Sequence, residues 1–325
     1  MRLSIITINY NNASGLRKTL ASVASQTYCD IEHIIIDGGS IDGSVEVIKE
    51  YVRNVERMND ERMNVVWSSE SDKGIYNAMN HGIEIALGRR IVNEDHTSNI
   101  THNTLQESLC DYVQILNSGD LLAALDVTER MMAALKAQND EMSCANVLNE
   151  PLSLNDGVAI LYGNMLKSYD GKTIINRDTC GGDMYTPESF LYFYKGTLNH
   201  DCAYIRRDLF EKYGLYNEQM KICSDWEWYV RAIVLGGEKP VYTNIDVTIF
   251  DMNGVSESYG KNADIIKRER REYLESILPP AVLHDYDMFS FPITQYQRLK
   301  KYHLWGLVYF MERVLFKLEK WRILR

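Results

Sequence analysis

Short apolar runs alternate with amphipathic segments through the first 125 residues. Runs rich in β-branched side chains predict strands at residues 3–9, 31–36, 65–69 and 112–116. Apolar residues that recur every three or four positions predict helices at residues 15–26, 44–51 and 75–87, the first capped by Ser14. This alternation predicts an α/β fold whose first half is a parallel sheet with right-handed crossovers.

The second half of the chain is less regular. Its pattern predicts helices at 127–137, 206–213 and 263–278, a further helix from Ser224, and strands at 158–164, 202–205 and 241–250. Polar residues without a clear period fill 89–110 and 139–156, which indicates an insertion before the fourth strand and a later loop.

Three predicted strands end in a carboxylate, namely those before Asp37, Asp72 and Asp120. The carboxyl ends of parallel strands share one edge of a sheet, and ligands bind at that edge. Asp37 precedes Gly38 and Gly39, so it suits either contact with a ribose or base or a simple glycine turn. Asp72 precedes a helix start, where an N-cap and a ligand contact are compatible with each other.

The turn Asn117-Ser118-Gly119-Asp120 follows the fourth strand. Mg²⁺ and Mn²⁺ prefer oxygen ligands and leave coordination positions to phosphates, so Asp120 is a candidate ligand for such an ion. A type I turn in which Asp120 caps the next helix fits these four residues equally well.

Composition narrows the function. The 325 residues carry a net charge of −10, which argues against a nucleic-acid-binding protein. The six cysteines form no CxxC pair and have no zinc-ligand spacing, so reduced thiols in a cytoplasmic protein are expected. Met1-Arg2 leads directly into a strand, and neither a signal peptide nor a membrane span is predicted. The chain lacks GxGxxG after its first strand and lacks a P-loop motif. These absences argue against a dinucleotide-binding protein and against a P-loop nucleotide-binding protein.

Four motifs in order resemble family 2 glycosyltransferases, which are inverting, nucleotide-sugar-dependent enzymes of the GT-A fold. They are Ser4-Ile5-Ile6-Thr7-Ile8-Asn9-Tyr10-Asn11, Ile36-Asp37-Gly38-Gly39-Ser40-Ile41-Asp42-Gly43-Ser44, Ser69-Glu70-Ser71-Asp72-Lys73-Gly74-Ile75-Tyr76-Asn77-Ala78-Met79-Asn80 and Leu116-Asn117-Ser118-Gly119-Asp120. The resemblance is specific over about 125 residues and weaker through His200 and Ser224-Asp225-Trp226-Glu227. It implies a GT-A-like domain at 1–258, with a nucleotide-sugar half to about 125 and an acceptor half after it, and a helical extension at 259–325.

The resemblance also implies roles for single residues. Asp120 looks like the metal ligand of the family's DxD motif, although this turn holds one carboxylate. Asp225 looks like the catalytic base, with Glu227 as the neighbouring alternative; an N-cap is the structural alternative for Asp225. The nucleotide contacts implied are Asn9, Asp37, Gly38, Asp72 and Asn117. The donor or acceptor contacts implied are Gly119, His200 and Trp226, although Trp226 fits a buried helix face better.

The implied function is a hexosyltransferase-type reaction. A sugar, from a UDP donor by preference, is transferred with inversion to a glycan or lipid-linked acceptor in surface polysaccharide synthesis, with Mg²⁺ or Mn²⁺ as cofactor. A non-catalytic nucleotide- or glycan-binding protein is the alternative from another class. A sugar nucleotidyltransferase would have a basic, Gly-rich loop after the first strand, unlike Tyr10-Asn11-Asn12.

The last 28 residues, 298–325, are basic. They hold eight Lys or Arg against two Glu, interleaved with aromatic and aliphatic residues. This pattern predicts a basic amphipathic helix that places a cytoplasmic protein on the inner face of an anionic membrane. A terminal helix docked on the protein's own core, or on a partner subunit of an oligomer, fits the pattern equally well.

Overall fold

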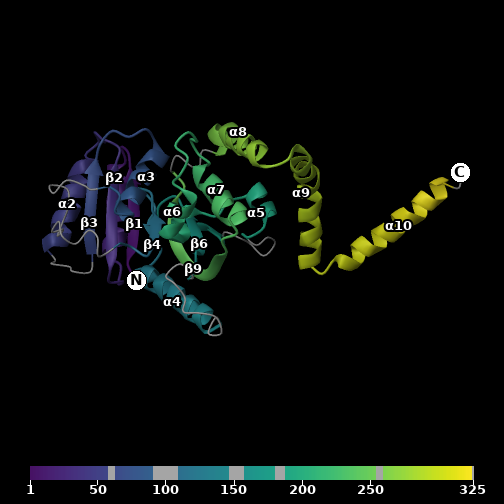
Figure 1. Cartoon of the computed structure of the whole chain (residues 1–325), viewed down its shortest axis with the longest axis horizontal. Coiled ribbons are helices and arrows are strands. Elements are labelled where there is room, and N and C mark those ends of the chain that lie inside the picture. Colours follow the sequence, from purple (N-terminus) through teal and green to yellow (C-terminus); the bar gives the residue numbers. More distant parts are fainter. Residues whose placement is uncertain (58–62, 91–108, 146–156, 180–186, 254–258, 324–325) are drawn as a thin grey trace.

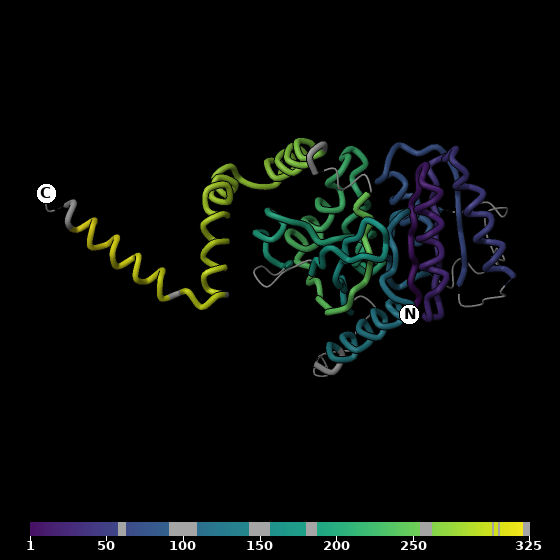
Figure 2. Tube along the Cα trace, turned by 180° about the vertical axis from the view of Figure 1, so that it is seen from behind, coloured from purple at the N-terminus to yellow at the C-terminus, as the bar shows by residue number. Residues whose placement is uncertain are grey.

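The computed structural model describes residues 1–57, 63–90, 109–145, 157–179, 187–253 and 259–323. An α/β body carries the N-terminal sheet at one end, and the C-terminal helices extend from the other (Figure 1). The view from behind shows the last helix clear of the body (Figure 2). The predicted α/β class is confirmed.

The N-terminal strands form the parallel sheet that the sequence predicts. Its order is β3-β2-β1-β4, with β1 at Leu3–Asn9, β2 at Ile31–Asp37, β3 at Met63–Ser69 and β4 at Tyr112–Ile115. Asn9 pairs in register with Asp37, and Asp37 pairs with Ser69. The carboxyl ends of three neighbouring strands therefore meet at one edge.

Helices α1 at Ala13–Ala24, α2 at Ser44–Arg57 and α3 at Ile75–Ala86 connect these strands. The predicted cap of the first helix is wrong. Asn12 is the N-cap, and its Oδ1 accepts a 3.1 Å hydrogen bond from the N–H of Gly15. A Cβ on Gly15 would lie 2.2 Å from the Asn12 side chain, so this cap requires glycine there.

The second half adds further strands to the sheet, most of them in antiparallel pairs, although β6 and β9 pair in parallel. The order continues through β8, β6, β9 and β5, with β7 paired to β6, so the described residues form a nine-stranded mixed sheet. The bounds are Leu121–Leu122 for β5, Ile160–Ser168 for β6, Ile174–Asp178 for β7, Ala203–Arg206 for β8 and Pro240–Asp251 for β9. Leu121 pairs with Ile249, so the end of β9 returns to the turn after β4.

Five helical segments accompany these strands. They are α4 at Val127–Ala145, α5 at Phe190–Lys195, a 3₁₀ turn at His200–Cys202, α6 at Asp208–Tyr213, and α7 at Ser224–Tyr229, which a π-helical turn at Val230–Leu235 continues. The loop predicted at 139–156 is helical as far as Ala145, and its remainder lies outside the described residues. Most of the predicted insertion, 91–108, also lies outside them.

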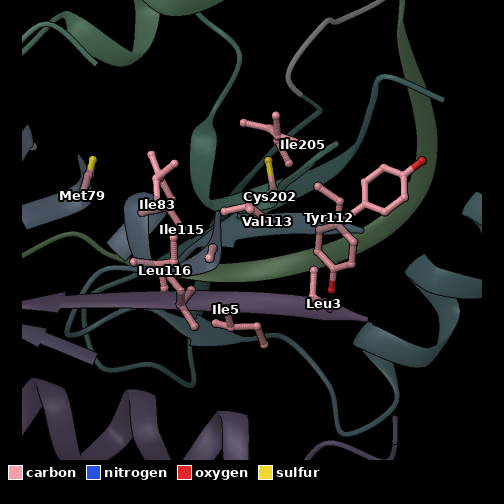
Figure 3. Packing of buried hydrophobic residues seen from close by; sticks show 14 of the residues in the cluster. Leu3, Ile5, Met79, Ile83, Tyr112, Val113, Ile115, Leu116, Cys202 and Ile205 are labelled. Atoms are coloured by element: carbon pink, nitrogen blue, oxygen red, sulfur yellow. The ribbon is translucent and has the colours of Figure 1, made fainter. Parts of the chain in front are cut away.

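The core lies on both faces of the sheet, between the strands and the helices that cover them. Figure 3 shows Leu3 and Ile5 of β1, Ile115 at the end of β4 and Ile83 of α3 packed in one cluster, and all four are nearly inaccessible to solvent. A histidine also lies inside this core. His33 of β2 is fully buried between Thr7 Oγ1 at 3.0 Å and Tyr51 Oη at 2.8 Å, and burial lowers the pKa of its imidazole to about 3.

The C-terminal region consists of α8 at Tyr259–Ile277, α9 at Pro280–Lys301 and α10 at Trp305–Ile323. Leu274 of α8 and Leu283 of α9 are buried in the main core, although the family resemblance does not extend to either helix. The predicted single basic helix is wrong, because α9 ends at Lys301 and α10 begins four residues later. None of the helices in the described ranges is long and apolar enough to cross a bilayer.

Candidate active site

Asp37 lies at the end of β2 and is fully buried among hydroxyl and amide donors. Its Oδ1 accepts from Asn9 Nδ2 at 2.7 Å and from the Ser40 hydroxyl at 2.6 Å. Its Oδ2 accepts from the Ser69 hydroxyl at 2.6 Å and from the Ser40 N–H at 2.9 Å. This carboxylate therefore orders the carboxyl edge of the sheet. Its contact with the nucleobase of a bound nucleotide stays a prediction.

Gly38 and Asp72 come together at the same edge. A Cβ on Gly38 would lie 2.5 Å from Asp72 Oδ2 and 3.2 Å from the Tyr10 ring, so this approach requires glycine. Asp72 Oδ1 accepts a 2.9 Å hydrogen bond from the N–H of Gly74, which is the N-cap residue of α3. The alternative interpretation of Asp72 as an N-cap is wrong, because Gly74 is the N-cap residue and no side chain caps α3. Asp72 instead closes the turn before the helix and lies beside Gly38, another nucleotide-binding candidate.

The turn after β4 is fixed from the side of α1. The Thr19 hydroxyl donates to the carbonyl of Asp120 at 2.8 Å and accepts from the N–H of Gly119 at 2.9 Å. Asn12 Nδ2 donates to the carbonyl of Ser118 at 2.9 Å. Gly119 has φ +113°, a conformation that strongly favours glycine. These bonds hold the Asp120 carboxylate in one place.

Asp120 is 4% exposed and lies among other acidic groups. Its Oδ1 accepts a 2.9 Å hydrogen bond from the N–H of Asp251, the last residue of β9. Burial, followed by the neighbouring charge of Asp201, raises the pKa of the Asp120 carboxyl to about 8. The sequence analysis missed Asp201 and Asp251, although Asp251 ends a predicted strand just as Asp37 does.

The donor set at this turn fits a hard divalent cation. Asp251 Oδ2 lies 3.3 Å from the position of a Cβ on Gly119, so the carboxylates of Asp120 and Asp251 occupy the same small region. A cation would compensate the buried charge that raises the pKa of Asp120. Among the described residues, no three His, Cys, Asp or Glu side chains gather closely enough to hold a metal ion. Phosphate oxygens and water would have to complete its coordination.

His200 connects the turn to α7. Its Nε2 lies 3.2 Å from Asn117 Nδ2, and its Nδ1 lies 3.4 Å from Asp225 Oδ2. A neutral His200 that accepts at Nε2 carries its proton on Nδ1, toward the carboxylate. On the opposite side, Tyr76 Oη lies 3.0 Å from Asp225 Oδ1. Two predicted site residues, Asn117 and Asp225, therefore share one imidazole.

The environment of Asp225 favours its ionised form. Burial by itself raises its pKa, but the hydrogen bond and charge of His200 and the hydrogen bond from Tyr76 outweigh burial and lower the pKa below its usual value. For His200, burial by itself lowers the pKa, but the hydrogen bond and charge of Asp225 outweigh it and raise the pKa. Asp225 is 14% exposed at its side chain, so an ionised carboxylate reaches the surface of the site.

Comparison with known proteins identifies the family. Residues 4–214, about two thirds of the chain, match the family described as Glycosyl transferase family 2. The chain belongs to this family. A relative described as the uncharacterized glycosyltransferase Rv1514c of Mycobacterium tuberculosis is 27% identical over 256 residues, which are 78% of this chain and 76% of the relative. The chain is thus a glycosyltransferase, and Asp225 and Asp251 lie beyond the matched residues.

Solved structures share the fold. TarS 1–349 of S. aureus in complex with UDP is 15% identical and superposes with a TM-score of 0.51 over 77% of this chain and 60% of that one. The mannosyltransferase PcManGT of Pyrobaculum calidifontis in complex with GDP-Man and Mn²⁺ is 14% identical, with a TM-score of 0.50 over 97% of this chain and 80% of that one. The glycosyltransferase therefore has the GT-A fold that the sequence motifs imply.

The two other predicted site residues on α7 of this glycosyltransferase, Glu227 and Trp226, are buried and bonded to other parts of the protein. Glu227 is 5% exposed, and both of its oxygens accept 3.0 Å hydrogen bonds from the guanidinium of Arg231. Trp226 is 1% exposed and donates from Nε1 to the carbonyl of Phe193 at 2.7 Å. This placement favours structural roles for Glu227 and Trp226 over the predicted base and acceptor contact, and it leaves Asp225 as the partly exposed carboxylate on α7.

Proposed function

We propose that the chain transfers a sugar from a nucleoside-diphosphate donor, with a UDP-sugar favoured, to a glycan or lipid-linked acceptor in surface polysaccharide synthesis, with inversion at the anomeric carbon. The observation that carries the proposal is the position of Asp225. Its ionised, partly exposed carboxylate is joined through His200 to the turn that holds Asp120. The complexes of TarS with UDP and of PcManGT with GDP-Man support a nucleotide-sugar donor.

Asp225 acts as the general base in this proposal. Inversion is a single displacement in which the acceptor oxygen attacks the anomeric carbon and the nucleoside diphosphate departs from the opposite face. One carboxylate suffices to take the acceptor proton, and Asp225 is ionised for that purpose. The Tyr76 hydroxyl and the His200 imidazole orient its two oxygens.

Asp120 and Asp251 are the residues that would hold a divalent cation, Mg²⁺ or Mn²⁺. When bound, the cation supplies charge neutralisation for the departing diphosphate. Asp37, Gly38, Asp72, Asn9 and Asn117 lie along the adjacent carboxyl edge, where we place the nucleotide. A side chain at position 119 would crowd the carboxylate of Asp251, so Gly119 keeps the space beside these two acids free. The PcManGT complex with Mn²⁺ supports a metal in this fold.

We further propose that α10 binds the cytoplasmic face of an anionic membrane, which would bring the enzyme to a lipid-linked acceptor. Leu307, Phe310, Leu315, Phe316 and Leu318 are all more than half exposed on this helix. Arg313, Lys317 and Lys320 are interleaved with them. Exposed apolar surface of this extent next to basic side chains suits a lipid interface.

A panel of UDP-glucose, UDP-galactose, UDP-GlcNAc and GDP-mannose tests the reaction. The protein should release nucleoside diphosphate from at least one donor in the presence of Mn²⁺ and much less in EDTA. The anomeric configuration of the transferred sugar, read by NMR, should be inverted. UDP binding in isothermal titration without turnover of any donor would instead identify a binding protein. Release of pyrophosphate from UTP and a sugar 1-phosphate would identify a nucleotidyltransferase.

A further inference from the structure

A buried carboxylate of α8 contacts the segment that leads into α7. Glu269 is 7% exposed, whereas its neighbours Arg268 and Glu272 are well exposed on the same helix. Its Oε1 accepts a 2.7 Å hydrogen bond from the N–H of Lys221. Its Oε2 accepts 3.1 Å hydrogen bonds from the N–H groups of Ile222 and Cys223. One side chain thus binds three consecutive backbone amides.

These amides belong to the turn that positions Asp225. Cys223 is the N-cap residue of α7, and its side chain makes no capping hydrogen bond. Asp225 follows two residues later. Glu269 therefore fixes the turn that leads into α7, from a position 46 residues further along the chain, without capping the first turn of the helix itself.

The backbone of Ile222 is held at both its N–H and its carbonyl group. Glu269 accepts from its N–H, and the Tyr76 hydroxyl of α3 contacts its carbonyl oxygen. The same hydroxyl lies 3.0 Å from Asp225 Oδ1. A shift of this backbone would therefore break its contact with the Tyr76 hydroxyl and disturb one of the two side-chain contacts that orient Asp225.

Helix α8 lies near α7 (Figure 1), and side chains of the two helices are in contact. The Arg270 guanidinium lies 5.0 Å from the centroid of the Trp226 ring, and Tyr273 meets that ring edge-on at 5.7 Å between centroids. Leu274 is buried one turn further on. The position of α8 relative to α7 is therefore fixed by packing, and Glu269 cannot leave the turn without breaking these contacts.

We propose that Glu269 is a positioning residue for the transfer reaction and that α8, which lies beyond the residues matching the family, is part of the active-site scaffold. Glu269 acts through the backbone of 221–223 and does not touch substrate. The role in catalysis rests on the proposed function of Asp225. Loss of Glu269 should allow the turn to move, separate Asp225 from His200 and Tyr76, and remove the contacts that lower the pKa of Asp225.

The test compares Glu269→Gln with Glu272→Gln, which makes the same charge change at an exposed position of the same helix. Hydrogen–deuterium exchange reports on the turn without any activity. Glu269→Gln should increase exchange at the amides of 221–223 at least tenfold, and Glu272→Gln should leave it unchanged. Unchanged exchange in Glu269→Gln would overturn the proposal, whatever reaction the protein catalyses.

Kinetics with the donor found in the panel then test the catalytic part. Glu269→Gln should lower kcat at least tenfold, keep the KM for the donor within twofold, and move the acid limb of the pH–rate profile to higher pH. A purely structural role would reduce the amount of active protein but leave the acid limb in place, and that result would overturn the positioning role. If Glu269→Gln does not fold, Glu269→Asp, which keeps the charge but shortens the side chain, is held to the same criteria. An inactive wild-type protein would count against the proposed function and not against the exchange result.

Discussion

The carboxylate of Asp225 lies 3.4 Å from the imidazole of His200, and His200 in turn contacts Asn117 in the turn after β4. This relationship joins the start of α7 to the carboxyl edge of the parallel sheet. It explains how an acidic side chain beyond the matched family residues comes to lie next to the proposed metal-binding turn. In this arrangement Asn117 Oδ1 is buried without a hydrogen-bond partner among the described residues. A half-turn of this amide would offer that oxygen to a protonated His200.

Replacement of Asp225 by Asn should abolish sugar transfer. The amide has nearly the same shape but cannot take a proton from the acceptor, and loss of a general base typically lowers kcat by about 10²–10⁴-fold. UDP affinity with Mn²⁺, measured by isothermal titration, should stay within about threefold of wild type because Asp225 is not assigned to the nucleotide. Asp126→Asn, which changes an exposed acid immediately before α4, serves as the control. Wild-type turnover in Asp225→Asn would remove Asp225 from the base role.

Glu227→Gln should destabilise the protein while sparing catalysis. Glu227 forms a two-point ion pair with Arg231, and Arg231 also donates to the carbonyls of Tyr213 and Leu215. Removal of one charge from a largely buried pair leaves the other uncompensated, at a cost of about 2–4 kcal/mol in the free energy of unfolding. Urea denaturation measures this loss. A normal melting curve together with a large fall in kcat would instead favour Glu227 as the base.

Asp120→Asn and Asp251→Asn should each weaken the Mn²⁺-dependent part of UDP binding by about tenfold or more, because each removes a carboxylate that we propose as a metal ligand. Binding in EDTA should change little. Asp246→Asn is the matched control, since Asp246 lies on the same strand as Asp251 but pairs with Arg177 at the surface. Titration of Mn²⁺ followed by electron paramagnetic resonance provides a readout that does not depend on turnover. An Asp251→Asn variant with wild-type Mn²⁺ affinity would restrict the site to Asp120.

The sequence predicted the first half of the fold because its strands are buried on both faces and end in Gly and Asp residues that the pattern makes visible. Asp37, Gly38 and Asp72 meet at one edge for this reason. The pattern could not place Asp251 or Glu269. Their contacts depend on β9 pairing with β5, directly after the turn that follows β4, and on α8 packing beside α7, and neither pairing has a local signal. Glu269 looked like one charge among many in a polar helix, and only its burial sets it apart.

His33 should make the protein less stable as the pH falls below 6.5. Burial lowers its folded-state pKa from 6.5 to about 3, so the unfolded chain binds a proton in this range and the folded protein does not. The free energy of unfolding should therefore fall as pH decreases, with a contribution from this group that approaches roughly 1.4 kcal/mol per pH unit. His33→Gln cannot titrate, so its urea midpoint should depend less steeply on pH between 6.5 and 5. Parallel pH dependences of the two proteins would show that His33 is accessible to protons in the folded state.

Binding of α10 to a membrane should depend on both charge and apolar surface. Each basic residue near an anionic bilayer contributes about 1 kcal/mol, so Arg313→Glu, Lys317→Glu and Lys320→Glu together should release the protein from vesicles containing phosphatidylserine. The control carries the same charge change at exposed positions of α1 and α2, as Lys18→Glu, Lys49→Glu and Arg53→Glu. Sedimentation with vesicles at low and high salt measures both proteins, and the control should remain bound. Because α10 lies clear of the body in both views, these changes should leave donor hydrolysis in solution unaltered. Equal release of the two triple variants would instead point to a non-specific effect of net charge, and an unbound wild-type protein would favour docking of α10 on a second polypeptide.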